Sequence, residues 1–268
     1  SLRWSFPVLE RHLPKTFLKT GGSQGSIHTP FTYSLRTPFQ LMYDYAESNS
    51  LQAIQSVRCL IYQMIRMTPV HYLEFHLFDA KSTGSHFREL VELQKIRESD
   101  QIDLNRKVTK GNFRFSSVYS DNKAVSEGLN KLNQFMIDAT DEMGTLKSLD
   151  MYNDANRDDS GRGIIPYQIL IVDNFPTGFN EDDIQKLDRL ITNGGDRGVF
   201  VILLNNRDEW QELNKKNSSR ENQTIYDKLT EKAMSTLGIL TLERGSATIN
   251  MNRYQTSFRL QLMPAERN

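Results

Sequence analysis

Two apolar runs constrain the fold of this chain more than any other part of its sequence. They are YQILIVD (Tyr167–Asp173) and RGVFVILLNN (Arg197–Asn206), and both are apolar at consecutive rather than alternating positions. A strand of this kind buries both of its faces, as central strands of a parallel sheet do when helices cover both sides. The runs therefore predict an α/β domain with a mainly parallel central sheet.

Strand and helix patterns alternate along the rest of the chain. We expect a strand from Pro38, a helix from Leu51 to Ile65, a strand from Tyr72 to Phe78, a helix from Ala124 to Met143 and a helix from Glu181 to Thr192. The segment from Asp150 to Gly163 is rich in Asp, Asn and Gly and is expected to be a polar surface loop. The alternation of strands and helices predicts helices packed on both faces of the sheet.

The two ends of the chain differ from its middle. Residues 1–37 are expected to form a leading segment, because Gly21, Gly22 and Gly25 interrupt it before regular patterns begin. Residues 38–268 are expected to form a single domain. Within it, short runs between residues 237 and 263 are separated by turn residues and predict short antiparallel strands at the C-terminal edge of the sheet.

Charge and apolar content exclude some classes of protein. The 33 basic and 33 acidic side chains cancel, so no strong overall field draws the chain to nucleic acid or to an anionic membrane. The longest apolar stretch, Val199–Leu204, is far shorter than the roughly 20 residues that cross a bilayer. Cys59 is the only cysteine, which excludes a disulfide framework. We expect a cytoplasmic fragment of a longer protein, tethered to a membrane only through regions outside this chain.

A phosphate-binding glycine loop is missing. Such a loop needs glycines so that backbone N–H groups wrap the phosphates, and one Lys that reaches the outer pair. The pattern GxxxxGK[ST] does not occur in the sequence. An apolar strand that ends in Asp173 is nevertheless what a magnesium-dependent nucleotidase uses, although many parallel strands end in Asp only to cap the next loop.

The order of five segments resembles the FtsK/SpoIIIE family of DNA-translocating ATPases. The segments are PFQLMYDY, TPVHYLEFHLFDAK, SLDMYNDAN, IPYQILIVDNF and GDRGVFVILLNN, which together span about Pro38 to Asn206. The resemblance implies a three-layer RecA-like P-loop NTPase fold and places the phosphate loop at Ala46–Ala53. There Ala46 and Leu51 replace both glycines, Gln52 replaces the lysine and Ala53 replaces the magnesium-binding hydroxyl.

The resemblance implies a vestigial nucleotide site. Its residues would be Ser48, Asn49, Ser50, Gln52, Asp173 and Asn205. The acidic pair of the family is matched by Asp173 but not by Asn174, so the carboxylate that orients the attacking water is missing. One charge-assisted hydrogen bond contributes about 1.5–3 kcal/mol, so the loss of the lysine and of part of the backbone cradle weakens nucleotide binding by roughly two to four decades. We expect no catalytic residue and no cofactor; ATP and magnesium would bind only if the degenerate site still functions.

Two classes of function follow from the resemblance. In the first, the domain is an assembly or DNA-contacting part of a larger bacterial DNA-translocating motor, with a ring oligomer as one arrangement. In the second, it resembles the degenerate ATPase domains of type VII secretion motors, which dock secreted protein substrates and regulate the active domain. An exposed apolar groove would favour the protein-binding class, and a basic pore would favour the DNA class.

Two further sets of residues suggest other chemistry. Candidate DNA contacts lie in a basic and aromatic segment, which a solvated hairpin explains as well: Arg106, Lys107, Lys110 and Arg114. Asp79 and Lys81 fit a metal-dependent nuclease of the PD-(D/E)xK type, a second alternative that needs another carboxylate on the same metal. The five histidines lack paired metal spacing, so no metal site is expected.

Overall fold

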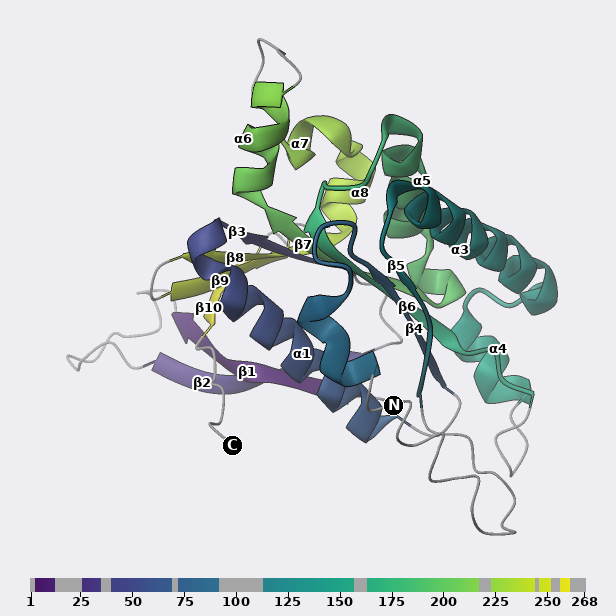
Figure 1. Cartoon of the computed structure of the whole chain (residues 1–268). Coiled ribbons are helices and arrows are strands. Elements are labelled where there is room, and N and C mark those ends of the chain that lie inside the picture. The colour runs from purple at the N-terminus through teal and green to yellow at the C-terminus, as the bar shows by residue number, and fades with distance from the viewer. Residues whose placement is uncertain are drawn as a thin grey trace, which may run out of the picture.

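A ten-stranded sheet forms the centre of the computed structural model, and helices cover both of its faces (Figure 1). The structure describes residues 3–12, 26–34, 40–68, 72–91, 113–156, 163–216, 223–243, 246–251 and 256–260. The strand order is β2-β1-β10-β9-β8-β3-β7-β6-β4-β5. The predicted α/β architecture with a mainly parallel centre is confirmed.

The strands fall into a parallel and an antiparallel part. Their bounds are β1 (Arg3–His12), β2 (Ser26–Ser34), β3 (Gln40–Tyr45), β4 (Leu73–Phe78), β5 (Phe113–Tyr119), β6 (Tyr167–Phe175), β7 (Val199–Asn206), β8 (Leu237–Glu243), β9 (Ser246–Met251) and β10 (Thr256–Leu260). From β8 to β5, all neighbours in the sheet run parallel. From β8 through β9, β10 and β1 to β2, all neighbours run antiparallel.

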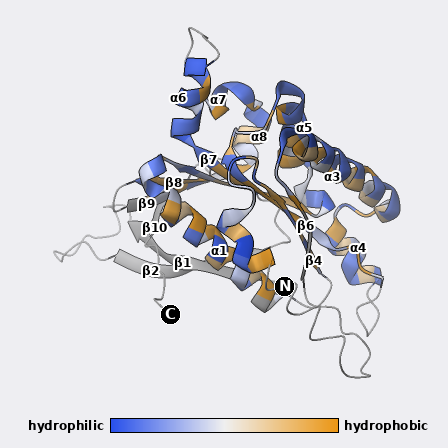
Figure 2. Ribbon diagram, viewed as in Figure 1, coloured by the Kyte–Doolittle hydropathy of each residue, from blue (hydrophilic) through white to orange (hydrophobic). Residues whose placement is uncertain are grey.

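Helices lie against the two faces of the sheet. Their bounds are α1 (Ser50–Met67), α3 (Asn122–Met143), α4 (Leu149–Asn156), α5 (Glu181–Asn193), α6 (Arg207–Lys216), α7 (Ile225–Lys228) and α8 (Glu231–Thr236), with short 3-10 turns η2 (Glu47–Asn49), η3 (Ser85–Phe87) and η4 (Gly195–Arg197). α1 covers one face, and α3, α5 and α8 cover the other (Figure 1). The long helices turn apolar sides to the sheet and polar sides outward (Figure 2). The layers are therefore helix, sheet and helix.

Successive residues of the central strands supply two separate cores. On β7, Phe200 and Ile202 pack in the core beneath α1, whereas Val201 and Leu203 pack in the core beneath α3 and α5. Every residue of β6 and β7 is buried. These strands need apolar side chains on both faces because adjacent side chains point to opposite faces, which explains why the two sequence runs do not alternate.

The C-terminal strands form the antiparallel group that the sequence predicts. β8 pairs antiparallel with β9, and β9 pairs antiparallel with β10. The other edge of β8 pairs with β3 in parallel, with Gln40 opposite Leu237 and Tyr45 opposite Leu242. The group is not the edge of the sheet, however, since β1 and β2 lie beyond β10, so two strands from residues 1–37 belong to the same sheet. Hydrophobic spacing carries no information on which strands are neighbours, which is why the sequence did not place β1 and β2 there.

A second correction concerns the polar segment after α3. Leu149–Asn156 forms helix α4 rather than a surface loop. Leu149 and Asn153, four residues apart on one helical face, are both buried. The Asn153 side chain donates to the carbonyl of Ile165 and accepts from its N–H, at 2.9 and 2.8 Å. These two bonds fasten the helix to the residues that lead into β6.

Candidate functional site

The turn from β3 to α1 occupies the place that the resemblance assigns to the phosphate loop. Ser48 and Asn49 lie in η2, Ser50 begins α1 and Gln52 lies in its first turn. Asn49 Nδ2 donates to the carbonyl of Leu242 on β8 at 3.1 Å, so this side chain is used to join the turn to a neighbouring strand.

Apolar and acidic residues occupy the turn to which the resemblance assigns the phosphate loop. Ala53 is fully buried in the core beneath α1 and offers no hydroxyl. The N–H of Glu47 donates to Asp208 Oδ2 at 2.7 Å, and Glu47 Oε2 accepts from Asn206 Nδ2 at 2.5 Å. A carboxylate of α6 thus occupies a backbone donor of the turn. The first turn after β3 is bound to acidic side chains of the chain itself.

A compact cluster of two aspartates and a histidine lies at the carboxyl ends of β4 and β6. His86 Nδ1 and Asp173 Oδ2 are 2.7 Å apart. One ligand-type atom each from Asp79, His86 and Asp173 lies within 4.8 Å of the others. Asp79 and Asp173 are fully buried, and His86 is partly exposed. The neighbouring parallel strands β4 and β6 bring together carboxylates that are 94 positions apart in the sequence.

Backbone donors hold Asp79 in a fixed orientation. Its two carboxylate oxygens accept from the N–H groups of Ser82 and Gly84, both at 2.7 Å. Gly84 has φ of 79°, the left-handed region that glycine adopts without strain. Asn174, which replaces the second acid of the family, donates to Ser82 Oγ at 3.2 Å. The Asn174 amide thus stabilises the Asp79 turn.

The cluster shifts the pKa values of both partners. The hydrogen bond that His86 donates to Asp173 raises the pKa of His86 above its usual value, partly offset by burial. Burial raises the pKa of Asp173, and the hydrogen bond to His86 opposes that shift. The ordinary pKa of a carboxyl group is far below that of an imidazole. The raised pKa of His86 means that the contact with Asp173 favours the charged imidazolium over the neutral ring.

The space around the turn is rich in negative charge. Lys81 forms an ion pair with Glu209, which raises the pKa of Lys81. The pKa of the buried Tyr45 hydroxyl is raised mainly by burial and further by four nearby carboxylates. These belong to Asp173, Glu47, Glu209 and Asp79. The lysine that follows β4 is thus already neutralised by an acid of α6.

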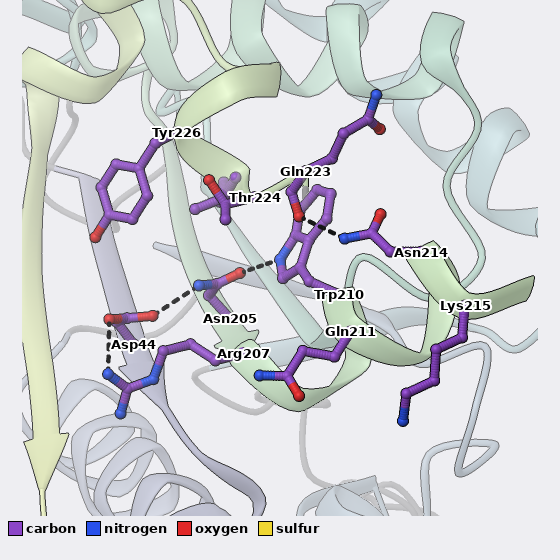
Figure 3. Close-up of a pocket in the computed structure, with 11 residues that line it drawn as sticks. Asp44, Asn205, Arg207, Trp210, Gln211, Asn214, Lys215, Gln223, Thr224 and Tyr226 are labelled. Atoms are coloured by element: carbon purple, nitrogen blue, oxygen red, sulfur yellow. Dashed lines mark hydrogen bonds and ion pairs between the residues drawn. The ribbon is translucent and has the colours of Figure 1, made fainter. Parts of the chain in front are cut away.

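Asn205 belongs to a different network, between β7 and β3. Its Nδ2 donates to Asp44 Oδ1 at 2.8 Å, and its Oδ1 accepts from Trp210 Nε1 at 2.9 Å (Figure 3). Arg207 lies 3.8 Å from the second oxygen of Asp44. These residues form one wall of a cavity of about 690 Å³ that α6 and the segment around Tyr226 enclose (Figure 3). Asn205 therefore orients Asp44 and Trp210.

The residues that the resemblance groups in one nucleotide site make different side-chain contacts in the structure. Asp173 meets Asp79, a residue predicted for another chemistry, while Asn205 and Asn49 contact other strands. The sequence analysis did not select His86, because its spacing from the other histidines indicates no site. Its contact with Asp173 exists because β4 and β6 are neighbours in the sheet. Glu47, Asp208 and Glu209 were also missed. The signal that could have found the cluster is a pair of apolar strands that both end in Asp.

The remaining candidate residues lie elsewhere. Arg106, Lys107 and Lys110 are outside the described residues, and Arg114 lies on β5. For the nuclease alternative, Glu74 lies near the start of β4, about 16 Å along the strand from Asp79. Its carboxylate accepts from Gln168 Nε2 at 3.3 Å. Glu74 therefore does not supply the second carboxylate of a metal site with Asp79.

Solved structures with the same fold are ATPase domains. No protein-family model matches the sequence, and no curated protein matches it significantly. EssC (ATPases 2 and 3) from Geobacillus thermodenitrificans is similar with a TM-score of 0.56 and 13% identity, over 98% of this chain and 45% of that one. The cytoplasmic domain of the type VII secretion ATPase EccC from Thermomonospora curvata gives 0.59 and 12%, over 97% and 28%.

A third structure is EccC from the same organism (ATPases 2 and 3) in complex with a signal sequence peptide. Its TM-score is 0.52 at 11% identity, over 98% of this chain and 41% of that one. This chain spans less than half the length of each of these structures. Because the identities are low, these matches establish only the fold, which this chain shares with P-loop ATPase domains of the FtsK/SpoIIIE type. The resemblance in the sequence is confirmed at this level.

Proposed function

We propose that this chain is a non-hydrolysing FtsK/SpoIIIE-like domain that docks protein substrates or regulates partner domains in a larger motor of the type VII secretion kind. The observation that carries the proposal is the turn from β3 to α1, where Asp208 accepts from the N–H of Glu47 at 2.7 Å. A triphosphate would have to displace that carboxylate. It would gain no lysine and no magnesium-binding hydroxyl in return.

Charge opposes a triphosphate at this turn. Two like unit charges about 6 Å apart repel by about 3 kcal/mol at an effective dielectric constant of about 20. That energy corresponds to about two decades in affinity. Glu47, Glu209 and Asp173 all act on the same tyrosine, and the nearby Lys81 is paired with Glu209. Hydrolysis suffers further, because lysine and magnesium also stabilise charge in the transition state.

A protein substrate is favoured over DNA by the neighbouring structures. The EccC structure with a signal sequence peptide aligns with 98% of this chain, at a TM-score of 0.52. The EssC and EccC structures of ATPases 2 and 3 are more than twice as long as the segment they share with this chain, which supports a larger assembly of FtsK-like domains. We propose a cytoplasmic location, with tethering through other regions. No helix among the described residues is long and apolar enough to span a membrane.

The DNA-contacting role remains the competing proposal. It depends on Arg106, Lys107, Lys110 and Arg114, which would neutralise phosphates. DNA binding through four such contacts weakens steeply as salt rises, with a slope of about −0.9 per neutralised phosphate. Docking of an apolar peptide does not show that dependence. A DNA titration at several salt concentrations therefore separates the two roles.

The test of the proposal is a titration with a fluorescent ATP analogue and magnesium, together with a turnover assay on the pure chain. We expect no saturable binding at micromolar nucleotide and no phosphate release. Asp173→Ala is the comparison, since this aspartate would hold the magnesium of a functional site. Saturable micromolar binding that disappears in Asp173→Ala, or turnover by the pure chain, contradicts the proposal.

A further inference from the structure

The cluster at the ends of β4 and β6 has the donor set of a metal site. Asp79, His86 and Asp173 each supply one oxygen or nitrogen, and these atoms lie within 4.8 Å of one another. His86 Nδ1 and Asp173 Oδ2 are 2.7 Å apart. Donors around a tetrahedral zinc ion at about 2.0–2.1 Å lie about 3.3 Å apart. The donors would have to close to that spacing when a metal binds, and the partly exposed His86 is the member with room to move.

An unpartnered oxygen points to a missing ligand at this place. Asp173 Oδ1 is buried and has no hydrogen-bond partner, and the Asp173 side chain is 0% exposed. Buried polar atoms in folded proteins almost always have a partner. His86 satisfies only the other oxygen of the same carboxylate. A cation bound to the cluster would satisfy the free oxygen and balance the two carboxylates.

We propose that Asp79, His86 and Asp173 bind a divalent transition-metal ion, Zn²⁺ in preference to Mg²⁺, without any nucleotide. The imidazole nitrogen decides the class, because Mg²⁺ prefers oxygen donors and retains its waters, whereas Zn²⁺ binds imidazole and carboxylate. Binding replaces the proton between His86 Nδ1 and Asp173 Oδ2, so one proton leaves as the metal enters. Open positions on the metal are filled by water.

The surroundings of the cluster suit a bound metal. Ser82 and Gly84 N–H groups orient Asp79, in the way that outer hydrogen bonds fix a ligating carboxylate. The ion would join the ends of β4 and β6 to η3, which carries His86. This role goes beyond the proposed docking function and does not depend on it, since no contact with ATP or with a substrate enters the argument.

The experiment measures metal binding by the full chain after treatment with a chelator. All proteins carry Cys59→Ser, because the exposed thiol would itself bind zinc. Calorimetric titrations with Zn²⁺ and with Mg²⁺, in the absence of nucleotide, compare the Cys59→Ser parent with His86→Gln and Asp173→Asn. Glu127→Gln on α3 is the matched control, since it removes an exposed carboxylate away from the cluster.

We expect one Zn²⁺ site per chain, which His86→Gln and Asp173→Asn each weaken by about tenfold or more. Glu127→Gln should leave it unchanged, and Mg²⁺ should bind far more weakly. Co²⁺ provides a second readout, because ligand-field absorption bands should appear in the parent protein and be lost in His86→Gln. Circular dichroism checks that the variants fold. Equal Zn²⁺ affinity in the parent and His86→Gln, or metal binding only when ATP is present, overturns the proposal.

Discussion

Replacing Gly128 in α3 with alanine tests how closely that helix packs on the sheet beside the Asp79 cluster. A Cβ at Gly128 would lie 2.6 Å from Phe78 Cζ and 2.8 Å from Tyr119 Cε1. Carbon atoms in contact are normally about 3.5–4.0 Å apart. Both rings are buried and pack edge to face with centroids 4.7 Å apart, so neither can move freely.

Two effects of opposite sign compete in this substitution. Alanine improves helix propensity by about 1 kcal/mol relative to glycine. Overpacking a filled core costs about 1–3 kcal/mol, and disturbing the Phe78–Tyr119 ring pair adds about 0.5–1.5 kcal/mol. The steric cost outweighs the propensity gain, and we expect a net loss of about 2 kcal/mol. In chains of this size, each kcal/mol of lost stability lowers the melting temperature by about 2–4 °C, so the melting temperature should fall by about 4–8 °C.

Chemical and thermal unfolding followed by circular dichroism measure this loss. Asn130→Ala is the control, because Asn130 is exposed on the same helix and should gain about 0.5 kcal/mol from propensity alone. A Gly128→Ala protein as stable as the wild type, beside a normal Asn130→Ala result, would refute the packing argument. The Asp79 N–H donates to the carbonyl of Tyr119 at 3.0 Å, so movement of these rings should also weaken metal binding.

Two further substitutions test the polar networks. Asn205→Ala removes the hydrogen-bond partner of two buried groups, the Asp44 carboxylate and Trp210 Nε1. The free energy of unfolding, measured with urea, should fall by about 1–3 kcal/mol for each group left without a hydrogen bond. A loss below about 1 kcal/mol would contradict this prediction. The pKa of His86 is higher in the folded state than in the unfolded state, where it is about 6.5. The stability contributed by the pair with Asp173 is therefore fully present below about pH 6.5 and is lost as the pH rises through the folded pKa. With a chelator present, the free energy of unfolding of the wild type should therefore fall as the pH rises through this range, and that of His86→Gln should fall less. The same pH dependence in both proteins would contradict the role given to His86.

The central elements of the fold could be predicted because their signal is local. Two runs of consecutive apolar residues identified β6 and β7, and helical spacing identified α1, α3 and α5. α4 was missed because DMYNDAN is polar and only Leu149 and Asn153 of the helix are buried. The place of β1 and β2 beyond β10 was missed because it depends on the pairing of Leu9 with Leu260, near opposite ends of the chain.

The candidate site was less predictable because its contacts cross long stretches of sequence. The expectation of a replaced phosphate loop rests on the letters AESNSLQA, which contain no glycine and no lysine and end in Ala53 where the family has a hydroxyl. The acidic side chains that fill its place come from α6 and could not be assigned without the structure. His86 meets Asp173 at 2.7 Å only because the turn after Asp79 returns over the end of β6.

The buried aspartates at the carboxyl ends of the parallel strands differ in how many of their oxygens have hydrogen-bond partners, and this difference indicates where a ligand binds. The buried carboxylate of Asp44 has Asn205, and that of Asp79 has two backbone N–H groups. Asp173 has one satisfied oxygen and one without a partner, in a side chain that is 0% exposed. The fold does not require this carboxylate, because two apolar cores already hold the sheet. A buried, half-satisfied charge that the packing does not need is best explained by a cation, and a nucleotide is not required to supply one.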